Sequence, residues 1–298
     1  MTGRTPPPQP FRWTLSAHGG ARPDTIGSLT EGHDDTRPGA WFLGELTACT
    51  AKVLARSDGA DLRFLGRSLD SMYDLLTGAL EHRTHRDALR RLPVSCPDDS
   101  RWSAAELRRF REHLAAAGLE PYALARRKRP LALVDVVAYG RSFGTLHRVL
   151  AAWIEESREP WPVIRRKLRY IGVTSRGSTS PHHWRWQQAP ESAWVRTLPA
   201  GSVRNVSLEY RMWTLLADAQ PKVTRSFPHR HWFAEGAGRP EHHDGLGPAL
   251  AMARALVEAG RSRAVREELI RLMAREPGFG GREQRALALA LRPGLHKS

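Results

Sequence analysis

The chain has 298 residues, 41% of them hydrophobic, and a formal net charge of +15. That hydrophobic content is enough to bury a core, which excludes a fully disordered basic protein. No apolar run approaches the about 18 residues of a membrane-spanning helix. Cys49 and Cys96 are far apart and have no metal-ligand spacing. The sequence therefore predicts a soluble, cytoplasmic protein without a membrane partner, a disulfide framework or a cysteine zinc site.

The positive charge comes mostly from arginine and is spread along the whole chain, with no basic tail. The preference for arginine over lysine fits a GC-rich bacterial coding bias. An excess of positive charge favours polyanionic partners, either a phosphorylated small molecule or a nucleic acid. The same distribution also suits solvated helix faces, so the charge alone does not separate these interpretations.

The first part of the chain is predicted to alternate between helices and strands. Residues 1–35 are rich in Pro and Gly and indicate an extended arm. Ser103 and Glu106 predict a capping box, and Gly118 a helix stop. The expected elements after the arm are a helix at 41–57, a strand at 62–65, a helix from 69, a strand at 92–96 and a helix at 104–117.

The most informative segment is the apolar run Pro130–Val137, which predicts a strand buried on both faces of a parallel sheet. A glycine-containing loop, a helix reaching Ile154 and a strand at 168–173 follow it. Strands that alternate with helices predict βαβ units with right-handed crossovers. The expected fold class is therefore α/β, with residues 36–175 as its domain.

Residues 176–298 have a different composition and are expected to form a mostly α-helical C-terminal cap that lines the active cleft. The spacing at 246–274 predicts two helices broken at Gly260. Residues 182–233 are rich in Trp and His. Neighbouring histidines point apart, which disfavours a metal site, whereas tryptophans interleaved with arginines suit either a core or a surface for single-stranded nucleic acid.

The loop after the buried strand has the features of an anion-binding site. Gly140 and Gly144 allow close approach of the backbone, and Ser142 and Thr145 carry hydroxyl donors. The helix N-terminus that follows adds N–H groups and positive potential. Asp135 ends the strand, where ligands bind in open α/β sheets.

The segment Val134–Ser142 (Val-Asp-Val-Val-Ala-Tyr-Gly-Arg-Ser) resembles the phosphoribosyl pyrophosphate signature of type I phosphoribosyltransferases. The resemblance covers about Trp41 to Thr174 and implies a phosphoribosyltransferase-like core. It implies that Asp135 contacts the ribose, directly or through Mg²⁺, as a catalytic residue. The residues that would hold the 5′-phosphate are Tyr139, Gly140, Arg141, Ser142, Phe143, Gly144 and Thr145.

The turn Gly66-Arg67-Ser68 lies where that family has its pyrophosphate-binding loop. The resemblance implies that Arg67 and Ser68 bind the pyrophosphate and that Arg67, as a second catalytic residue, offsets the charge on it when it leaves. Val134 stands in place of the family's first acid, and Tyr139 in place of its first threonine. The implied activity is a glycosyltransferase reaction of nucleotide metabolism, in which ribose phosphate from phosphoribosyl pyrophosphate or a related ribose phosphate passes to an acceptor. A homodimer is compatible with it.

Two alternatives remain open. The first is a non-catalytic protein on the same fold that binds nucleotides or nucleic acid. The second is a serine hydrolase, because Gly140–Gly144 also matches a Gly-x-Ser-x-Gly nucleophile elbow around Ser142, with His18–Gly20 as an oxyanion loop. Without a ligand, Ser142 would be a helix N-cap and Asp135 a strand-end turn former.

Overall fold

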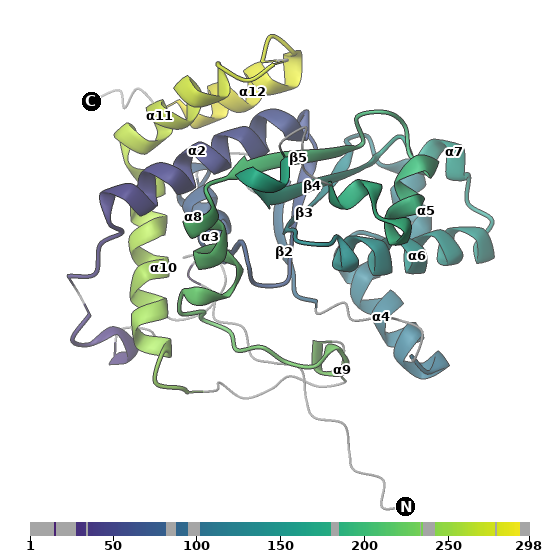
Figure 1. Ribbon diagram of the computed structural model, residues 1–298, viewed down its shortest axis with the longest axis horizontal. Helices are drawn as coiled ribbons and strands as arrows, with labels where there is room; N and C mark the ends of the chain where they lie inside the picture. Colours follow the sequence, from purple (N-terminus) through teal and green to yellow (C-terminus); the bar gives the residue numbers. More distant parts are fainter. Residues whose placement is uncertain are drawn as a thin grey trace, which may run out of the picture.

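The computed structural model describes residues 15, 28–33, 35–81, 88–94, 102–179, 185–232, 234, 242–277 and 279–292. At its centre is an all-parallel sheet with the strand order β2-β1-β3-β4-β5 (Figure 1). The predicted α/β class with a parallel sheet is confirmed. The strands are β1 (Asp61–Leu65), β2 (Leu89–Leu92), β3 (Leu131–Val136), β4 (Leu168–Ser175) and β5 (Val203–Leu208).

The strand order determines which face of the sheet each connection covers. The chain moves one way from β1 to β2 and the other way for every later crossover. Because parallel crossovers are right-handed, the first connection covers one face and the later ones the opposite face. The first is α3 (Asp70–Ala79); the later ones are α4 (Ala104–Ala116), α5 (Pro121–Arg126), α6 (Arg141–Glu156), α7 (Trp161–Ile164), η4 (Arg176–Thr179), η5 (Trp186–Gln188) and η6 (Pro190–Thr197).

The α3 face needs further helices to cover it, and these come from both ends of the chain. Helices α3 and α10 contact each other, as do α2 and α11 (Figure 1). Their apolar residues form one core with the sheet. The helices are α2 (Ala40–Ser57), α10 (Leu246–Arg261), α11 (Arg263–Met273) and α12 (Arg282–Leu291).

The boundary expected at residue 175 does not divide this structure. β5 pairs in parallel with β4, from Tyr170 opposite Val203 to Ser175 opposite Leu208. Residues after 175 therefore complete the α/β core instead of forming a separate cap. Beyond β5 lie the short α8 (Tyr210–Thr214), the π-helical turn η7 (Leu215–Ala219) and α9 (His229–Trp232).

The predicted capping box of α4 is confirmed: the Ser103 side chain accepts from the N–H of Glu106. Two other predicted boundaries need correction. The strand expected at 92–96 is β2, which ends at Leu92. The helix break expected at Gly260 falls at Ser262, which caps α11.

Alternate residues of β3 face the two cores. Ala132 and Val134 pack towards α2 and α3, and Leu131 and Leu133 towards α6. The second core also contains three tryptophans of the segment 182–233, Trp186, Trp194 and Trp232. Trp213 of the same segment is half-buried and packs against the first core. Most of the arm expected at 1–35 lies outside the described residues. None of the helices in the described ranges is long and apolar enough to cross a lipid bilayer.

Two glycines let α3 and α10 approach closely. A Cβ atom at Gly78 would overlap the carbonyl oxygen of Val257, and one at Gly260 would overlap that of Leu75. Gly260 therefore lies inside α10 as a packing residue. The tight crossing holds the C-terminal helices against the first crossover helix.

We expect Gly78→Ala and Gly260→Ala each to lower the free energy of unfolding by about 1 to 3 kcal/mol, because the added methyl groups have no room. Gly44→Ala is the matched control. Gly44 is also a helical glycine, but nothing lies within 4 Å of its Cβ position, so alanine should stabilise α2 by up to about 1 kcal/mol. Urea unfolding measures all three; equal effects would contradict the close packing.

Candidate functional site

The strand order reverses between β1 and β3. In doubly wound sheets ligands bind at such a reversal, outside the carboxyl ends of the strands. Two turns border this place, one at 66–69 after β1 and one at 137–140 after β3. All site residues predicted from the sequence lie on these turns, at the end of β3 or at the start of α6.

Asp135 lines a cleft of about 210 Å³ together with every residue from Val136 to Phe143. Its side chain is buried, and one carboxylate oxygen accepts the N–H of Val136 at 2.8 Å. Burial raises the pKa of Asp135 to about 8, and the hydrogen bond from Val136 opposes this only in part. At neutral pH the group is therefore protonated and can donate as well as accept a hydrogen bond.

The N-terminus of α6 forms the other side of the cleft. Gly140 is the N-cap residue and has a φ of 75°, a conformation that favours glycine. The first helical bond runs from the N–H of Gly144 to the carbonyl of Gly140 at 2.9 Å. The N–H groups of Arg141, Ser142 and Phe143 precede it, and such first-turn groups are the ones that bind anions.

Two residues of the predicted phosphate loop, Gly144 and Thr145, do not line the cleft. The N–H of Gly144 is used by the helix, and the buried Thr145 hydroxyl accepts from Arg148 at 3.1 Å. The Phe143 ring is buried edge-to-face against Tyr170. These three residues support the helix, and only Phe143 keeps a backbone N–H at the cleft. Tyr139 is 73% exposed, with the Arg141 guanidinium 5.6 Å from its ring.

Trp186 supports the loop from a distant part of the chain. The sequence marks it only as one of the tryptophans of a core or a nucleic-acid surface, not as a neighbour of this loop. A Cβ atom at Gly140 would overlap its ring, and its indole N–H donates to the side chain of Asn205 at 2.9 Å. Asn205 lies opposite Gly172, which lies opposite Asp135. The only sequence signal was the Trp-rich composition of this segment.

Arg67 and Ser68 lie on the turn after β1. The Arg67 guanidinium donates to the carbonyl of Thr224 at 2.9 Å. Burial lowers the pKa of Arg67, and the charges that oppose this are Asp70 and Asp218. The carbonyl of Ser68 accepts from Lys222 at 3.3 Å. Both residues therefore belong to a second polar cluster, beside the Asp135 cleft.

This second cluster was not predicted. Asp70 and Asp74 on α3 form ion pairs with Arg91 of β2 at 3.3 and 2.6 Å. Burial raises the pKa of Asp74 to about 7, more than Arg91 lowers it. Burial also lowers the pKa of Lys222 to about 8. The residues of the cluster are widely separated in sequence, so no local motif reveals it.

Neither the hydrolase nor a metal centre gains support from the geometry. Ser142 is the second residue of α6, not its cap, and forms no hydrogen bond with a histidine in the described part of the chain. His147 is buried, stacked on Trp194 and hydrogen bonded to Tyr170.

No group of His, Cys, Asp or Glu among the described residues could hold a metal ion alone. His18–Gly20 and His182–Trp184 lie outside those residues.

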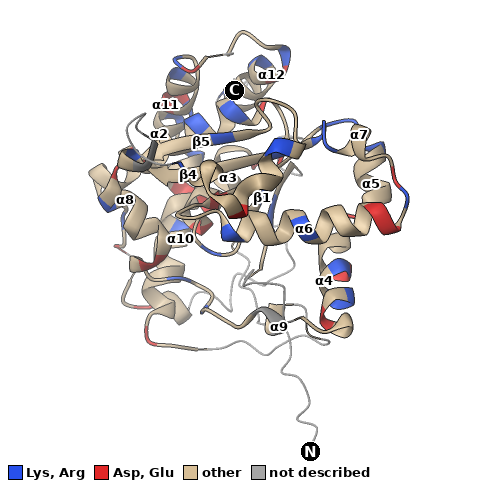
Figure 2. Ribbon diagram, turned by 45° about the vertical axis from the view of Figure 1, so that its right-hand side comes forward, with Lys and Arg blue, Asp and Glu red and all other residues tan. Residues whose placement is uncertain are grey.

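The basic residues do not gather at one place. Figure 2 shows lysine and arginine scattered over helices throughout the molecule, with acidic residues among them. Several arginines form ion pairs with glutamates. These arginines are therefore neutralised within the protein, although such pairs leave the net charge unchanged: the pairs are Arg111 with Glu156, Arg126 with Glu159 and Arg261 with Glu81.

Comparison with known proteins identifies no relative. No protein-family model matches the chain, and no curated protein or solved structure is significantly similar to it. The functional interpretation therefore depends on the geometry of the chain itself.

We expect Asp135→Asn to raise the free energy of unfolding at neutral and mildly basic pH. The unfolded carboxyl ionises above its ordinary pKa of 3.8, whereas the folded one stays protonated up to about 8, so the wild-type protein loses stability as the pH rises between these values. Since each pKa unit corresponds to about 1.4 kcal/mol, the difference between the two pKa values sets an upper bound of about 6 kcal/mol, so the variant should gain several kcal/mol near pH 8 and almost nothing near pH 4. Urea unfolding at both pH values measures this.

The control is Asp61→Asn. Asp61 is the first residue of β1 and lies at the amino ends of the strands, away from the Asp135 cleft. Asp61 pairs with Arg127 and Arg129, so its neutralisation should lower stability near pH 8. A loss of stability for Asp135→Asn as well would show that Asp135 is ionised and compensated in the folded protein.

Proposed function

We propose that the cleft at the end of β3 binds the phosphorylated ribose of a small molecule, with phosphoribosyl pyrophosphate as the model ligand. The observation that carries this proposal is the pairing of a buried acid with a helix N-terminus across one small cleft. A sugar phosphate has hydroxyl groups for the first and an anion for the second. The resemblance of Val134–Ser142 to the phosphoribosyltransferase signature points to the same ligand.

In this proposal Asp135 receives the ribose hydroxyls. A carboxyl group that is buried without a cation is costly unless a ligand offers it hydrogen bonds. The 5′-phosphate binds the N–H groups of Arg141, Ser142 and Phe143, with the Ser142 hydroxyl as a further donor, and the helix dipole favours its charge. Arg67 and Ser68, on the neighbouring turn, meet the pyrophosphate.

The cleft fits a magnesium ion only as a partner shared with the ligand. Among the described residues Asp135 is the one carboxylate that lines it, and Val134 faces the opposite core. Mg²⁺ keeps several waters and takes one or two carboxylates together with substrate phosphates. Asp135 would give up its proton when the ion is bound and hold the ion through water, and the ion would supply neutralisation of the pyrophosphate charge.

The proposed reaction transfers ribose phosphate to an acceptor with loss of pyrophosphate. The chain's own contribution is positioning and charge stabilisation: the helix N-terminus fixes the phosphate, Asp135 orients the ring, and Arg67 offsets charge on the leaving group. A non-catalytic nucleotide-binding protein would use the same cleft without releasing pyrophosphate.

Calorimetry with phosphoribosyl pyrophosphate and Mg²⁺ tests the binding step. We expect Asp135→Asn to weaken binding at least about tenfold, because an amide nitrogen cannot accept from a ribose hydroxyl as the second carboxyl oxygen does. Ser142→Ala loses one hydroxyl donor and should weaken binding about threefold. Ser157→Ala, at the other end of α6, is the matched control and should bind like the wild type. Ribose 5-phosphate as a second titrant separates the sugar phosphate from the pyrophosphate.

Absence of binding by the wild-type protein, or unchanged binding by the double variant Asp135→Asn with Ser142→Ala, would refute the proposal. The calorimetry is read with the unfolding data, since Asp135→Asn is expected to be more stable than the wild type. A stable variant that fails to bind identifies Asp135 as a ligand-binding residue.

A fluorophosphonate probe checks the hydrolase alternative. We expect no labelling of Ser142, because this serine has no histidine hydrogen bond and lies within the first turn of a helix. Intact-mass spectrometry of the treated protein measures labelling, with Ser142→Ala as the control. Labelling that disappears in this variant would favour the hydrolase.

A further inference from the structure

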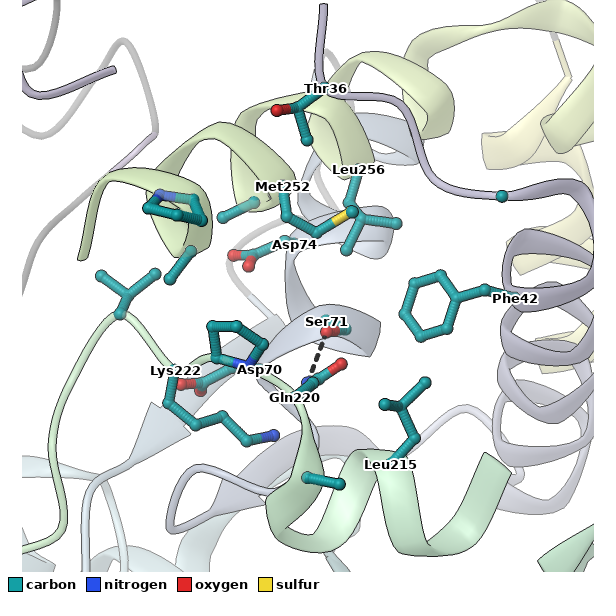
Figure 3. A pocket seen from close by; sticks show the side chains of 17 residues that line it. Thr36, Phe42, Asp70, Ser71, Asp74, Leu215, Gln220, Lys222, Met252 and Leu256 are labelled. Atoms are coloured by element: carbon teal, nitrogen blue, oxygen red, sulfur yellow. Dashed lines mark hydrogen bonds between the residues drawn. The ribbon is translucent and has the colours of Figure 1, made fainter. Parts of the chain in front are cut away.

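A second and larger cavity lies between α3 and α10. It has a volume of about 330 Å³, which is within the range of small-molecule sites. The residues before α2 and the start of that helix form one wall, and the segment 219–223 closes another (Figure 3). The hydrogen bond between Gln220 and Ser71 at 2.8 Å fastens this segment to α3.

One end of the cavity carries buried carboxylates with unused acceptors. Asp70 is only 7% exposed, and its Oδ2 atom is buried with no hydrogen-bond partner among the described residues. Asp74 has Arg91 as its hydrogen-bond partner through Oδ1 only. Both side chains line the cavity (Figure 3). A buried acceptor without a donor costs free energy, so this end of the cavity calls for a ligand that donates hydrogen bonds.

The local charges decide between a cationic and a neutral donor. Arg91 contacts both carboxylates, and Lys222 donates to the carbonyls of Leu216 and Ser68 beside them. Arg67 and Asp218 add one further charge of each sign, so three acids and three bases balance around this end of the cavity. A ligand cation would add an uncompensated buried charge, which is costly, so the charge balance favours a neutral ligand.

The rest of the cavity is apolar. Phe42, Leu215, Met252 and Leu256 surround it, coming from three different helical segments (Figure 3). Burial of an apolar body there is favourable in proportion to its area. Volume and lining together suit a molecule about the size of a two-ring aromatic compound.

We propose that this cavity binds a neutral small molecule with an apolar, two-ring-sized body and a hydrogen-bond donor at the end that meets Asp70 and Asp74. The site is separate from the Asp135 cleft, and no residue in the described part of the chain lines both. Its occupant is therefore a second ligand, distinct from the sugar phosphate.

The probes that test it are naphthalenes that differ in one group: 2-naphthol with a neutral donor, 2-methoxynaphthalene without a donor, and 2-naphthylmethylamine with a cation. Ligand-observed NMR titration of the full chain measures their affinities. We expect 2-naphthol to bind about tenfold more tightly than 2-methoxynaphthalene, the difference that one charge-assisted hydrogen bond makes.

Three variants locate the site. Asp70→Asn should reduce the ratio between the two probes to about threefold or less, because a neutral acceptor bonds more weakly. Asp218→Asn removes the same charge nearby without altering the cavity lining and should leave the ratio unchanged. Met252→Trp fills the cavity and should abolish binding of both probes, with circular dichroism to verify its fold.

Equal affinities of 2-naphthol and 2-methoxynaphthalene for the wild-type protein, no binding of either, or tighter binding of the amine would each overturn the proposal. So would probe binding that survives in a folded Met252→Trp. If Asp70→Asn does not fold, the probe series on the wild type and Met252→Trp still decide. The titrations contain no phosphate, so their outcome is independent of binding at Asp135.

Discussion

Burial of β3 on both faces is the constraint on which the rest of the structure depends. Leu131, Ala132, Leu133 and Val134 are all inaccessible to solvent, and the strand pairs with β1 on one side and β4 on the other. A central parallel strand needs a layer of helices on each face. Right-handed crossovers cover one face fully and the other only with α3, so α2 and the C-terminal helices have to cover the remainder.

This requirement explains why the C-terminal third could not be understood from its own composition. Its helices look like those of an independent cap, yet α10 packs on α3 through Gly78 and Gly260, and β5 is the edge strand of the same sheet. Sequence patterns report the apolar face of a helix but not the surface that it covers. The fold class was predictable because the run at Pro130–Val137 is local and continuous, and the capping box of α4 was predictable for the same reason.

β2 shows where apolar patterning fails. Its sequence is Leu-Arg-Arg-Leu, which does not suggest a buried strand, and apolar patterning predicts the strand at residues 92–96 instead. Arg91 is inside because Asp70 and Asp74 neutralise it and the Tyr73 ring lies 4.4 Å from its guanidinium carbon. This arginine is compatible with a buried strand only because the aspartates of α3 lie beside it. The sequence of β2 does not reveal that α3 packs there.

The same distinction between local and distant partners separates the two candidate sites. Asp135 and the start of α6 are consecutive in the chain, so the first cleft could be predicted from the sequence alone. The second cavity takes its polar residues mostly from α3 and the segment after η7, and Arg91 of β2 pairs with its two aspartates. Its apolar wall comes from helices near both ends of the chain. Such a site appears only when the sheet has brought these elements together.

The two sites also differ in how their buried acids are stabilised. Burial raises the pKa of both Asp135 and Asp74, but Arg91 opposes it at Asp74, whereas at Asp135 only a backbone N–H does. The ion pairs of the second site are complete without a ligand, so its selectivity must come from shape and from the spare acceptors. At the first site the chain leaves the acid uncompensated, at a cost that is a sizeable part of the about 5 to 15 kcal/mol by which a domain is stable. A ligand that hydrogen bonds to Asp135 would offset part of that cost on binding, which favours the cleft at β3 over the second cavity as the site of the proposed function.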